Sequence, residues 1–254
     1  MRFGVVGMGR AGGSFAAALG SVGWEIGAAW GSGDDASGAA QDVDVLLLAV
    51  PDRVVGVVAN VIQPGPAAVL HVAGSLTLEP LGAHARRGSV HPLMALPDAD
   101  VGAARLLDSC RFAVAGDPAA TQVAEALGGQ AFTVKDEHRQ LYHAGAAIAS
   151  NHLVALAEQA QRLARAAGVP ADVYNQLMIA SLNNVATADP VSALTGPAAR
   201  ADWETVRGHA AAIEATGHPT DRMLYLMFAA EAAQMAGHRL PDDVFPDDVK
   251  PPND

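Results

Sequence analysis

The sequence predicts an α/β fold, in which an N-terminal doubly wound, mostly parallel sheet is followed by an all-helical C-terminal domain. Short apolar runs alternate with helical stretches as far as Val134, which is typical of strands joined by crossover helices. Beyond Lys135 the chain has no further strand-like run. We therefore expect a sheet domain over 1–136, a helical domain over 137–240 and a disordered, acidic tail over 241–254.

The first strand runs into a glycine-rich turn. The apolar residues that follow Arg2 end in Gly7-Met8-Gly9-Arg10-Ala11-Gly12, and a helix is expected from Ser14 to about Ser21. In this G-x-G-x-x-G pattern the first glycine makes a tight turn, the second lets the backbone approach a pyrophosphate, and the third lets the helix pack on the sheet. The free N–H groups at the start of such a helix attract phosphates. The pattern therefore predicts a dinucleotide site.

The other elements follow in chain order. Residues 44–50 form a continuous apolar run, as expected of a strand that is buried on both faces. Further strands are expected over 24–30, 67–72, 88–92, 111–115 and 130–134. Helices are expected over 53–62, 117–127, 137–167, 171–186, 202–216 and 219–236.

Composition excludes several classes of function. The formal net charge of −11 argues against nucleic-acid or anionic-membrane partners, which are bound through surplus Lys and Arg. No apolar run approaches the ~20 residues that a membrane helix needs, and glycines and Arg10 interrupt any secretory signal. Cys110 is the only cysteine, and no metal-binding motif is present. We expect a cytoplasmic protein without a metal site.

The end of the second strand bears on the choice of cofactor. An acidic residue that would bind the ribose 2′-hydroxyl of NAD is missing at 30–32, and Ser32 can donate to a 2′-phosphate. An arginine is missing there too, and Asp34 and Asp35 follow, so NADP is favoured only modestly over NAD. Arg10 either reaches a phosphate or is a solvated loop residue. The expected cofactor contacts are Gly7, Met8, Gly9, Arg10, Ala11, Gly12, Ser32, Val50, Pro51, Asp52 and Ala73.

Residues just after the strands are the candidates for the substrate site, because ligands of open α/β sheets bind at the carboxyl ends of the strands. Asp52 and Ser75 are more commonly helix N-caps, although Ser75 is also a substrate candidate. His71 lies within its strand, which favours a hydrogen-bonded core histidine. His91 ends a strand, precedes Pro92 and has no capping role, so a catalytic role competes with a structural one.

The long helix predicted over 137–167 supplies a second group of candidates. Residues 142–156 are apolar nearly all round, which predicts a buried helix. At 100° per residue, His143, Ser150 and Asn151 fall on one stripe with Ala147. Polar groups on a buried helix need partners, and either a ligand or a structural network can supply them.

Two features of the C-terminal half complete the candidates. Arg200 follows the turn Thr195-Gly196-Pro197 and can bind a carboxylate in bidentate geometry, although a structural or solvated arginine is the commoner outcome. Met223, Met227 and Met235 are spaced as on one helix face, and we expect them in the core.

Five segments resemble one group of bacterial proteins, which pair a Rossmann-like domain with a helical C-terminal domain of unknown function. The segments are D-V-L-L-L-A-V-P-D, H-V-A-G-S-L, G-S-V-H-P-L, L-Y-H-A-G-A-A-I-A-S-N-H-L and L-T-G-P-A-A-R-A-D-W-E-T-V-R-G-H. More distantly, the chain is similar to prephenate dehydrogenase, pyrroline-5-carboxylate reductase, ketopantoate reductase and the 6-phosphogluconate dehydrogenase clan. The resemblance implies a catalytic role for His91. Some of these relatives carry Lys four residues before Asn151, where this chain has Ala147, so either His143 takes that role or the chemistry differs.

Together these features predict an NAD(P)-dependent oxidoreductase that prefers NADP. It would transfer hydride to or from a small carboxylate-bearing carbonyl, alcohol or imine at an interdomain cleft. His91 and His143 compete as the proton donor, Asn151 orients the carbonyl, and Ser75, Ser150 and Arg200 contact the substrate. The alternative is a catalytically silent NADP-binding sensor. The apolar helices over 141–156 and 219–236 further predict a homodimer through the helical domain.

Overall fold

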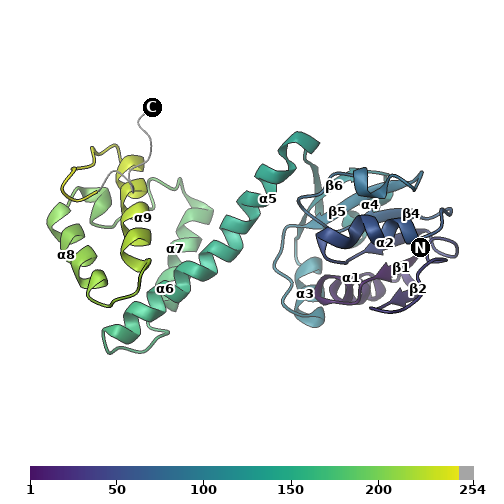
Figure 1. The fold of residues 1–254 in the computed structure, drawn as a ribbon, viewed down its shortest axis with the longest axis horizontal. Coiled ribbons are helices and arrows are strands. Elements are labelled where there is room, and N and C mark those ends of the chain that lie inside the picture. The colour runs from purple at the N-terminus through teal and green to yellow at the C-terminus, as the bar shows by residue number, and fades with distance from the viewer. Residues whose placement is uncertain (246–254) are drawn as a thin grey trace. The chain divides into compact units, whose positions relative to one another are not determined.

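The computed structural model describes residues 1–245, and residues 246–254 of the tail predicted over 241–254 lie outside the described residues. The chain divides into two compact units between Ser150 and Asn151 (Figure 1). Strands give way to helices near residue 136, as expected. The division between the units falls later, inside the long helix, because the first turns of that helix pack on the sheet.

A seven-stranded sheet forms the core of the first unit. Its strand order is β2-β1-β3-β4-β5-β6-β7, and every neighbouring pair is parallel except β5 and β6. The strands are β1 Arg2–Val6, β2 Glu25–Trp30, β3 Val45–Leu48, β4 Ala68–His71, β5 Arg87–Pro92, β6 Arg111–Gly116 and β7 Gln130–Thr133. This confirms the doubly wound α/β fold that the alternating pattern predicts.

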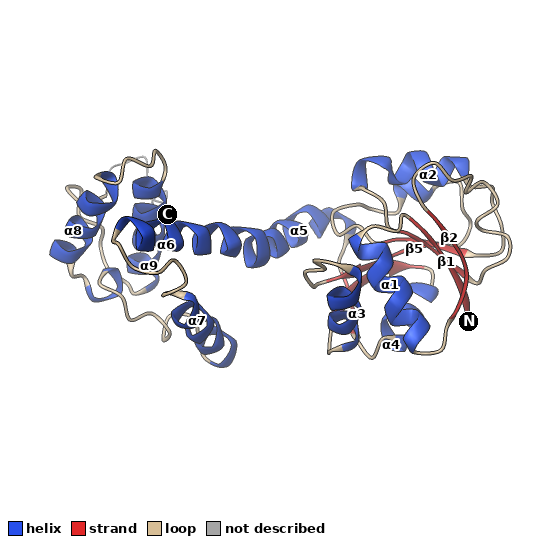
Figure 2. Cartoon of the chain, turned by 90° about the horizontal axis from the view of Figure 1, so that it is seen from below, coloured by secondary structure: helices blue, strands red, loops and turns tan. Residues whose placement is uncertain are grey.

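Helices cover both faces of the sheet (Figure 2). One face carries α2 (Val55–Val61), and the other carries α1 (Arg10–Ser21), α3 (Ala99–Leu107) and α4 (Ala119–Ala126). The sequence analysis missed α3. Its start nevertheless carries a local signal, because the Asp98 carboxylate accepts a hydrogen bond from the Val101 N–H at 2.8 Å and so caps the helix.

The two sheet faces build separate apolar cores from alternate strand residues. Phe3 and Val5 of β1 pack with Phe15 and the helices α3 and α4. Val6 on the same strand packs on the opposite face, toward α2. Val45–Leu48 is fully buried along its length, as expected of a central parallel strand. The two cores hold the parallel strands in register, so that their carboxyl ends lie along one edge of the sheet.

The long helix runs through α5 (Arg139–Ala147), a π-helical segment (Ile148–His152) and α6 (Leu153–Ala166). Its extent agrees with the prediction, but its predicted burial is wrong. Leu141, Ile148 and Val154 are exposed. Other elements of the chain cover only part of the surface of this helix. Its apolar residues are therefore not all buried within the single chain.

The second unit is helical, as predicted. It contains α7 (Asn175–Thr187), α8 (Trp203–Glu214) and α9 (Asp221–Met235) after α6. Val206, Leu226 and Ala230 are at its core. Asp202 caps α8 by accepting a hydrogen bond from the Thr205 N–H. Among the described residues, no helix is both long and apolar enough to cross a membrane.

The beginning of the predicted tail is ordered. Val244 and Phe245 are buried in the core of the second unit, and the Phe245 ring meets Trp203 edge to face. Arg207 forms an ion pair with Asp243 at 2.6 Å. The prediction of disorder is therefore wrong for 241–245, because two apolar side chains at the end of this segment return to the core.

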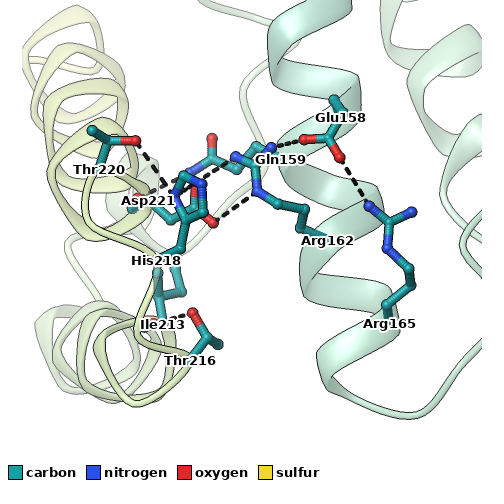
Figure 3. A network of polar contacts seen from close by, with 9 residues as sticks. All are labelled: Glu158, Gln159, Arg162, Arg165, Ile213, Thr216, His218, Thr220 and Asp221. Atoms are coloured by element: carbon teal, nitrogen blue, oxygen red, sulfur yellow. Dashed lines mark hydrogen bonds and ion pairs between the residues drawn. The ribbon is translucent and has the colours of Figure 1, made fainter.

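A polar network joins α6 to the start of α9 (Figure 3). Arg162 donates two hydrogen bonds to the carboxylate of Asp221, which is 1% exposed. His218 Nδ1 lies 3.1 Å from the same carboxylate, and Gln159 donates to the Asp221 backbone carbonyl. The Arg162 contact is the main cause of the lowered pKa of Asp221. This network holds the two helices together through charge-assisted bonds.

The methionines of α9 do not occupy the core. Met223, Met227 and Met235 are exposed, whereas Leu226 and the alanines of α9 are buried. The prediction is wrong because the small alanine face packs on the neighbouring elements, which leaves the methionine face outward.

Candidate functional site

The glycine turn has the backbone geometry that the pattern requires. Gly7 has φ +96°, a conformation that side chains with a Cβ rarely adopt. A Cβ atom on Gly12 would lie 1.9 Å from the Gly7 carbonyl oxygen, so only glycine lets α1 approach this closely. Gly9 is the N-cap of α1, and a Cβ there would meet no atom within 4 Å. Space beside the helix N-terminus is therefore open.

A pocket of about 630 Å³ lies beside this turn. It is formed by the segments that follow β1, β2 and β3 and by α2. Since β1 pairs with β2 on one side and β3 on the other, this is the point where the strand order reverses. Six of the predicted cofactor residues line it: Gly7, Met8, Gly9, Ser32, Val50 and Pro51.

The other predicted cofactor residues are not among the residues that line the pocket. Arg10 begins α1 and is exposed, and Gly12 is buried beneath the turn. Ala73 is buried after β4. Contacts from these residues, and from Ala11 and Asp52, stay predictions.

Two carboxylates line the pocket after β2. Asp34 Oδ2 accepts a hydrogen bond from the Gly31 N–H at 2.7 Å, and Asp35 Oδ1 accepts one from the Ser37 N–H at 2.9 Å. The Ser37 bonds lower the pKa of Asp35. Both aspartates therefore stabilise the loop that contains Ser32. None of the described residues that line the pocket carries a positive charge.

Asp52 and Ser75 contact one another and do not cap helices. Ser75 Oγ donates a hydrogen bond to Asp52 Oδ2 at 2.8 Å. The prediction that both are N-caps is wrong, because the turn after β3 has Pro51 at its cap position and the turn after Ser75 begins at Glu79. The contact ties the end of β3 to the end of β4.

His91 and His143 come together above this edge of the sheet. The two rings meet edge to face with centroids 6.0 Å apart. Tyr142, which the sequence analysis did not select, forms a hydrogen bond of 2.7 Å between its hydroxyl and His91 Nδ1. A Cβ on Gly74 would lie 2.8 Å from both histidine rings, so the turn after β4 passes directly against them.

Burial keeps His91 and Tyr142 uncharged. It lowers the pKa of His91 to about 4, and the neighbouring His143 adds to the effect. It also raises the pKa of Tyr142 to about 12. At neutral pH the structure thus holds a neutral imidazole against a protonated phenol, so a proton given up or taken at His91 Nε2 can be balanced by one exchanged with Tyr142 at Nδ1.

Below the pair lie His71, Ser89 and Arg139. His71 is fully buried and donates from Nε2 to the Thr77 carbonyl at 3.1 Å, which confirms the interpretation of a core histidine. Its burial lowers its pKa to about 4. Arg139 is buried as well and donates to Ser89 Oγ at 3.0 Å.

The remaining candidates either form local hydrogen bonds or belong to the second unit. Ser150 donates to the Ala146 carbonyl within its own helix. Asn151 is exposed and begins the second unit, which also contains Arg200. Arg200 donates to the Thr195 carbonyl and braces its own loop. Ser150 and Asn151 lie in the π-helical segment, so the 100° per residue that we used to place them on one stripe with His143 does not hold there.

Four residues of this group escaped the sequence analysis: Gly74, Ser89, Arg139 and Tyr142. A signal for two of them exists, since Arg139 and Tyr142 are three residues apart and so lie on one side of a helix. Nothing local in the sequence indicates which strand that side would face.

The chain was compared with known proteins. Residues 110–232 match DUF2520, a domain of unknown function. The match spans a little under half of the chain. The DUF2520 match begins just before β6 and ends in α9, so it includes Arg139, Tyr142 and His143 but not His91. It confirms the resemblance to proteins with a helical C-terminal domain of unknown function.

Solved structures share the fold beyond the residues that match DUF2520. A protein from Thermotoga maritima is 25% identical with a TM-score of 0.71, and a protein from Bacteroides fragilis described as an NADP oxidoreductase is 18% identical with a TM-score of 0.75. The 1-pyrroline-5-carboxylate reductase of Streptococcus pyogenes is 15% identical with a TM-score of 0.61. Each comparison covers 92% of this chain and 98% of the other. No curated protein sequence matches significantly.

Proposed function

We propose that this protein is a nicotinamide-dinucleotide oxidoreductase. The observation that carries the proposal is that a pocket beside the glycine turn and a neutral His91–Tyr142 pair occupy the same edge of one sheet. The fold is shared with a protein described as an NADP oxidoreductase and with a pyrroline-5-carboxylate reductase, which supports this class of reaction.

The residues of the pocket fit a dinucleotide. Open space beside Gly9 and the free N–H groups at the start of α1 suit a pyrophosphate, and Val54, Val57 and Val58 offer an apolar wall. Gly7, Met8, Gly9, Ser32, Val50 and Pro51 would hold the cofactor, with Arg10 beside the phosphates. When bound, the nicotinamide supplies the hydride chemistry.

The protein itself would supply proton transfer and orientation. His91 would accept a proton from a substrate alcohol or deliver one to a carbonyl or imine, and Tyr142 would exchange that proton at Nδ1. His143 lies against the same ring and is the competing donor. Ser75, held by Asp52, offers a hydroxyl to the substrate. The proposed substrates are small carboxylate-bearing carbonyls, alcohols and imines. Asn151, Ser150 and Arg200 are the predicted substrate contacts.

A modest preference for NADP is part of the proposal. Asp34 is engaged by the Gly31 N–H, which leaves Ser32 as a hydroxyl donor for a 2′-phosphate. Because the described lining offers no cation and includes two aspartates, we expect a preference of about tenfold, the lower end of what one hydrogen bond to a charged group is worth.

We further propose a homodimer formed through the helical domain. Among the described residues, α7 buries none of its side chains and exposes Leu177, Ile179 and Leu182, while α9 exposes Met227 and Phe228. Exposed apolar helix faces of this kind mark association sites.

A cytoplasmic location is also proposed, because Cys110 is a buried, unpaired thiol.

A silent nucleotide-binding sensor is the second candidate. Ala147 stands where some relatives implied by the resemblance carry a lysine, and this favours binding without turnover. The two candidates differ in one measurable respect, since only the enzyme sustains oxidation of the cofactor.

Titration with NADPH and NADH, followed by a screen of NADPH oxidation, tests the proposal. The screen covers 2-keto acids, 2-keto lactones and cyclic imines, and repeats any activity with His91→Ala and His143→Ala. We expect His91→Ala to lower kcat by about 10²–10⁴ while cofactor affinity is kept. Absence of binding to either cofactor would contradict both candidates, and binding without turnover would favour the sensor.

A further inference from the structure

Arg139 is a buried cation whose surroundings satisfy it only in part. It is 1% exposed at the start of α5. Its Nε lies 3.2 Å from the exposed carboxylate of Asp136, and its Nη2 donates to Ser89 Oγ at 3.0 Å. Its Nη1 has no hydrogen-bond partner among the described residues. Because burying a guanidinium is unfavourable, a position of this kind calls for a role beyond solubility.

Among the described residues, Arg139 forms one of the two side-chain hydrogen bonds that join α5 to β5. Ser89 and His91 are two residues apart on the strand and so point to the same face. Arg139 and Tyr142 are one turn apart on the helix and so lie on one side of it. Arg139 binds Ser89, and Tyr142 binds His91. The first contact therefore sets the register in which the second one forms.

We propose that Arg139 is a positioning residue for the proton-transfer pair His91–Tyr142, because it anchors the helix that carries the tyrosine to the strand that carries the histidine. This inference rests on the proposed role of His91. It adds a residue that neither the sequence motifs nor the fold comparisons select.

The charge of Arg139 acts on the same pair. Burial is the main cause of the low pKa of His91, and the charges of His143 and Arg139 lower it further, as does His71. Asp52 acts in the opposite direction. Arg139 also lowers the pKa of Tyr142 against the larger effect of burial. The cation thus favours a neutral imidazole and a more acidic phenol.

His71 completes the surroundings of the cation. It lies opposite Ser89 in the register of β4 and β5, and its Nδ1 has no hydrogen-bond partner among the described residues. Since Nε2 donates to Thr77, Nδ1 of the neutral ring is an acceptor. Arg139 Nη1 likewise has no hydrogen-bond partner among the described residues, and the charge of Arg139 adds to the lowering of the His71 pKa by burial.

The test is an NMR titration of the histidine side chains in the full-length protein without cofactor. Arg139→Met removes the charge at similar length, and we expect the titration midpoint of His91 to rise by about half a pH unit. Arg139→Lys restores the charge and should return the midpoint toward that of the unmodified protein. A purely structural role would not respond to this rescue.

Arg86→Met is the matched control. Arg86 directly precedes β5 and binds Asp117 through two hydrogen bonds of 3.0 and 3.1 Å, so its loss removes a cation and an ion pair beside the other end of the strand. We expect no change in the midpoint of His91 in this variant.

Ser89→Ala keeps the charge and removes only the anchor. We expect it to change the ¹⁵N shift of His91 Nδ1, because the bond to Tyr142 loses its register, and this readout remains if Arg139→Met does not fold. Unchanged His91 shifts in Ser89→Ala, or an unchanged midpoint in folded Arg139→Met, would overturn the inference. Neither measurement needs turnover, so failure of the proposed function is seen separately in the cofactor titration.

Discussion

The hydroxyl of Tyr142 lies 2.7 Å from Nδ1 of His91, although 51 residues separate them in the chain. The bond joins a helix that follows the sheet to a strand within it, and His143 meets the same imidazole ring at its edge. A histidine that is neutral and hydrogen-bonded to a protonated phenol is prepared for proton transfer without a change of net charge. The predictions below follow from this arrangement and from the pocket beside the glycine turn.

Stability should depend on pH through the buried histidines. The pKa values of His71 and His91 lie at about 4 in the folded state and near 6.5 when unfolded. Between these pH values the unfolded state binds more protons, so the free energy of unfolding falls as the pH drops from 6.5 toward 4. We expect a loss of ~2 kcal/mol per histidine at pH 5 relative to pH 8. His91→Gln should remove one of the two contributions in chemical denaturation, and an equal pH dependence would contradict a neutral His91.

Gly74→Ala should disturb catalysis more than cofactor binding. Its Cβ would lie 2.8 Å from both His91 and His143, so the rings must move, at about 1–3 kcal/mol for overpacking. We expect kcat to fall while the Kd of NADPH changes little. Gly145→Ala is the control, because a Cβ there meets nothing within 4 Å. If Gly74→Ala is as active as Gly145→Ala, the reaction does not take place beside His91 and His143.

Two glycines of the turn should separate cofactor binding from folding. Gly9→Ala places a methyl group in open space, so we expect an unchanged Tm but weaker binding of NADPH. Gly12→Ala brings a Cβ within 1.9 Å of the Gly7 carbonyl oxygen, so both Tm and binding should fall. Calorimetry and cofactor titration measure the two effects. Undiminished affinity in Gly9→Ala would mean that the phosphates bind elsewhere.

The dimer proposal predicts that a charge on α7 separates the subunits. Leu182 is 47% exposed, and Leu182→Glu should convert a dimer to a monomer in light scattering without loss of helix content. Val101→Glu on α3 is the control, since Val101 is exposed to a similar degree in the sheet unit. A monomeric unmodified protein, or a dimeric Leu182→Glu, would count against the proposed interface.

Asp221 should be a main contributor to the stability of the helical unit. Asp221→Asn removes the charge that Arg162 and His218 face, and we expect a loss of about 1–3 kcal/mol in the free energy of unfolding. Asp243→Asn is the control, because its ion pair with Arg207 is exposed and worth ~0–1 kcal/mol. Equal effects of the two substitutions would show that the buried network adds nothing.

Local patterns in the sequence were enough for the fold and for half of the candidate site. Strand and helix periods depend on neighbouring residues, and the turn at Gly7 to Gly12 depends on the missing Cβ atoms, so both can be inferred without tertiary contacts. His91 was found because it ends a strand and serves no local purpose. The π-helical segment and α3 were missed, since neither has a periodicity that stands out from the surrounding apolar residues.

By itself, the sequence determined a doubly wound sheet, a glycine turn suited to a dinucleotide, and a histidine at the end of β5. Only the tertiary structure decided that Tyr142 and His143 meet His91, that Gly74 lies against them, and that Arg139 anchors the helix to Ser89. It also decided that the apolar faces of the C-terminal helices stay exposed in the single chain. The reason is physical, because local structure follows from neighbours along the chain, whereas these contacts depend on how a helix packs on a strand some 50 residues away.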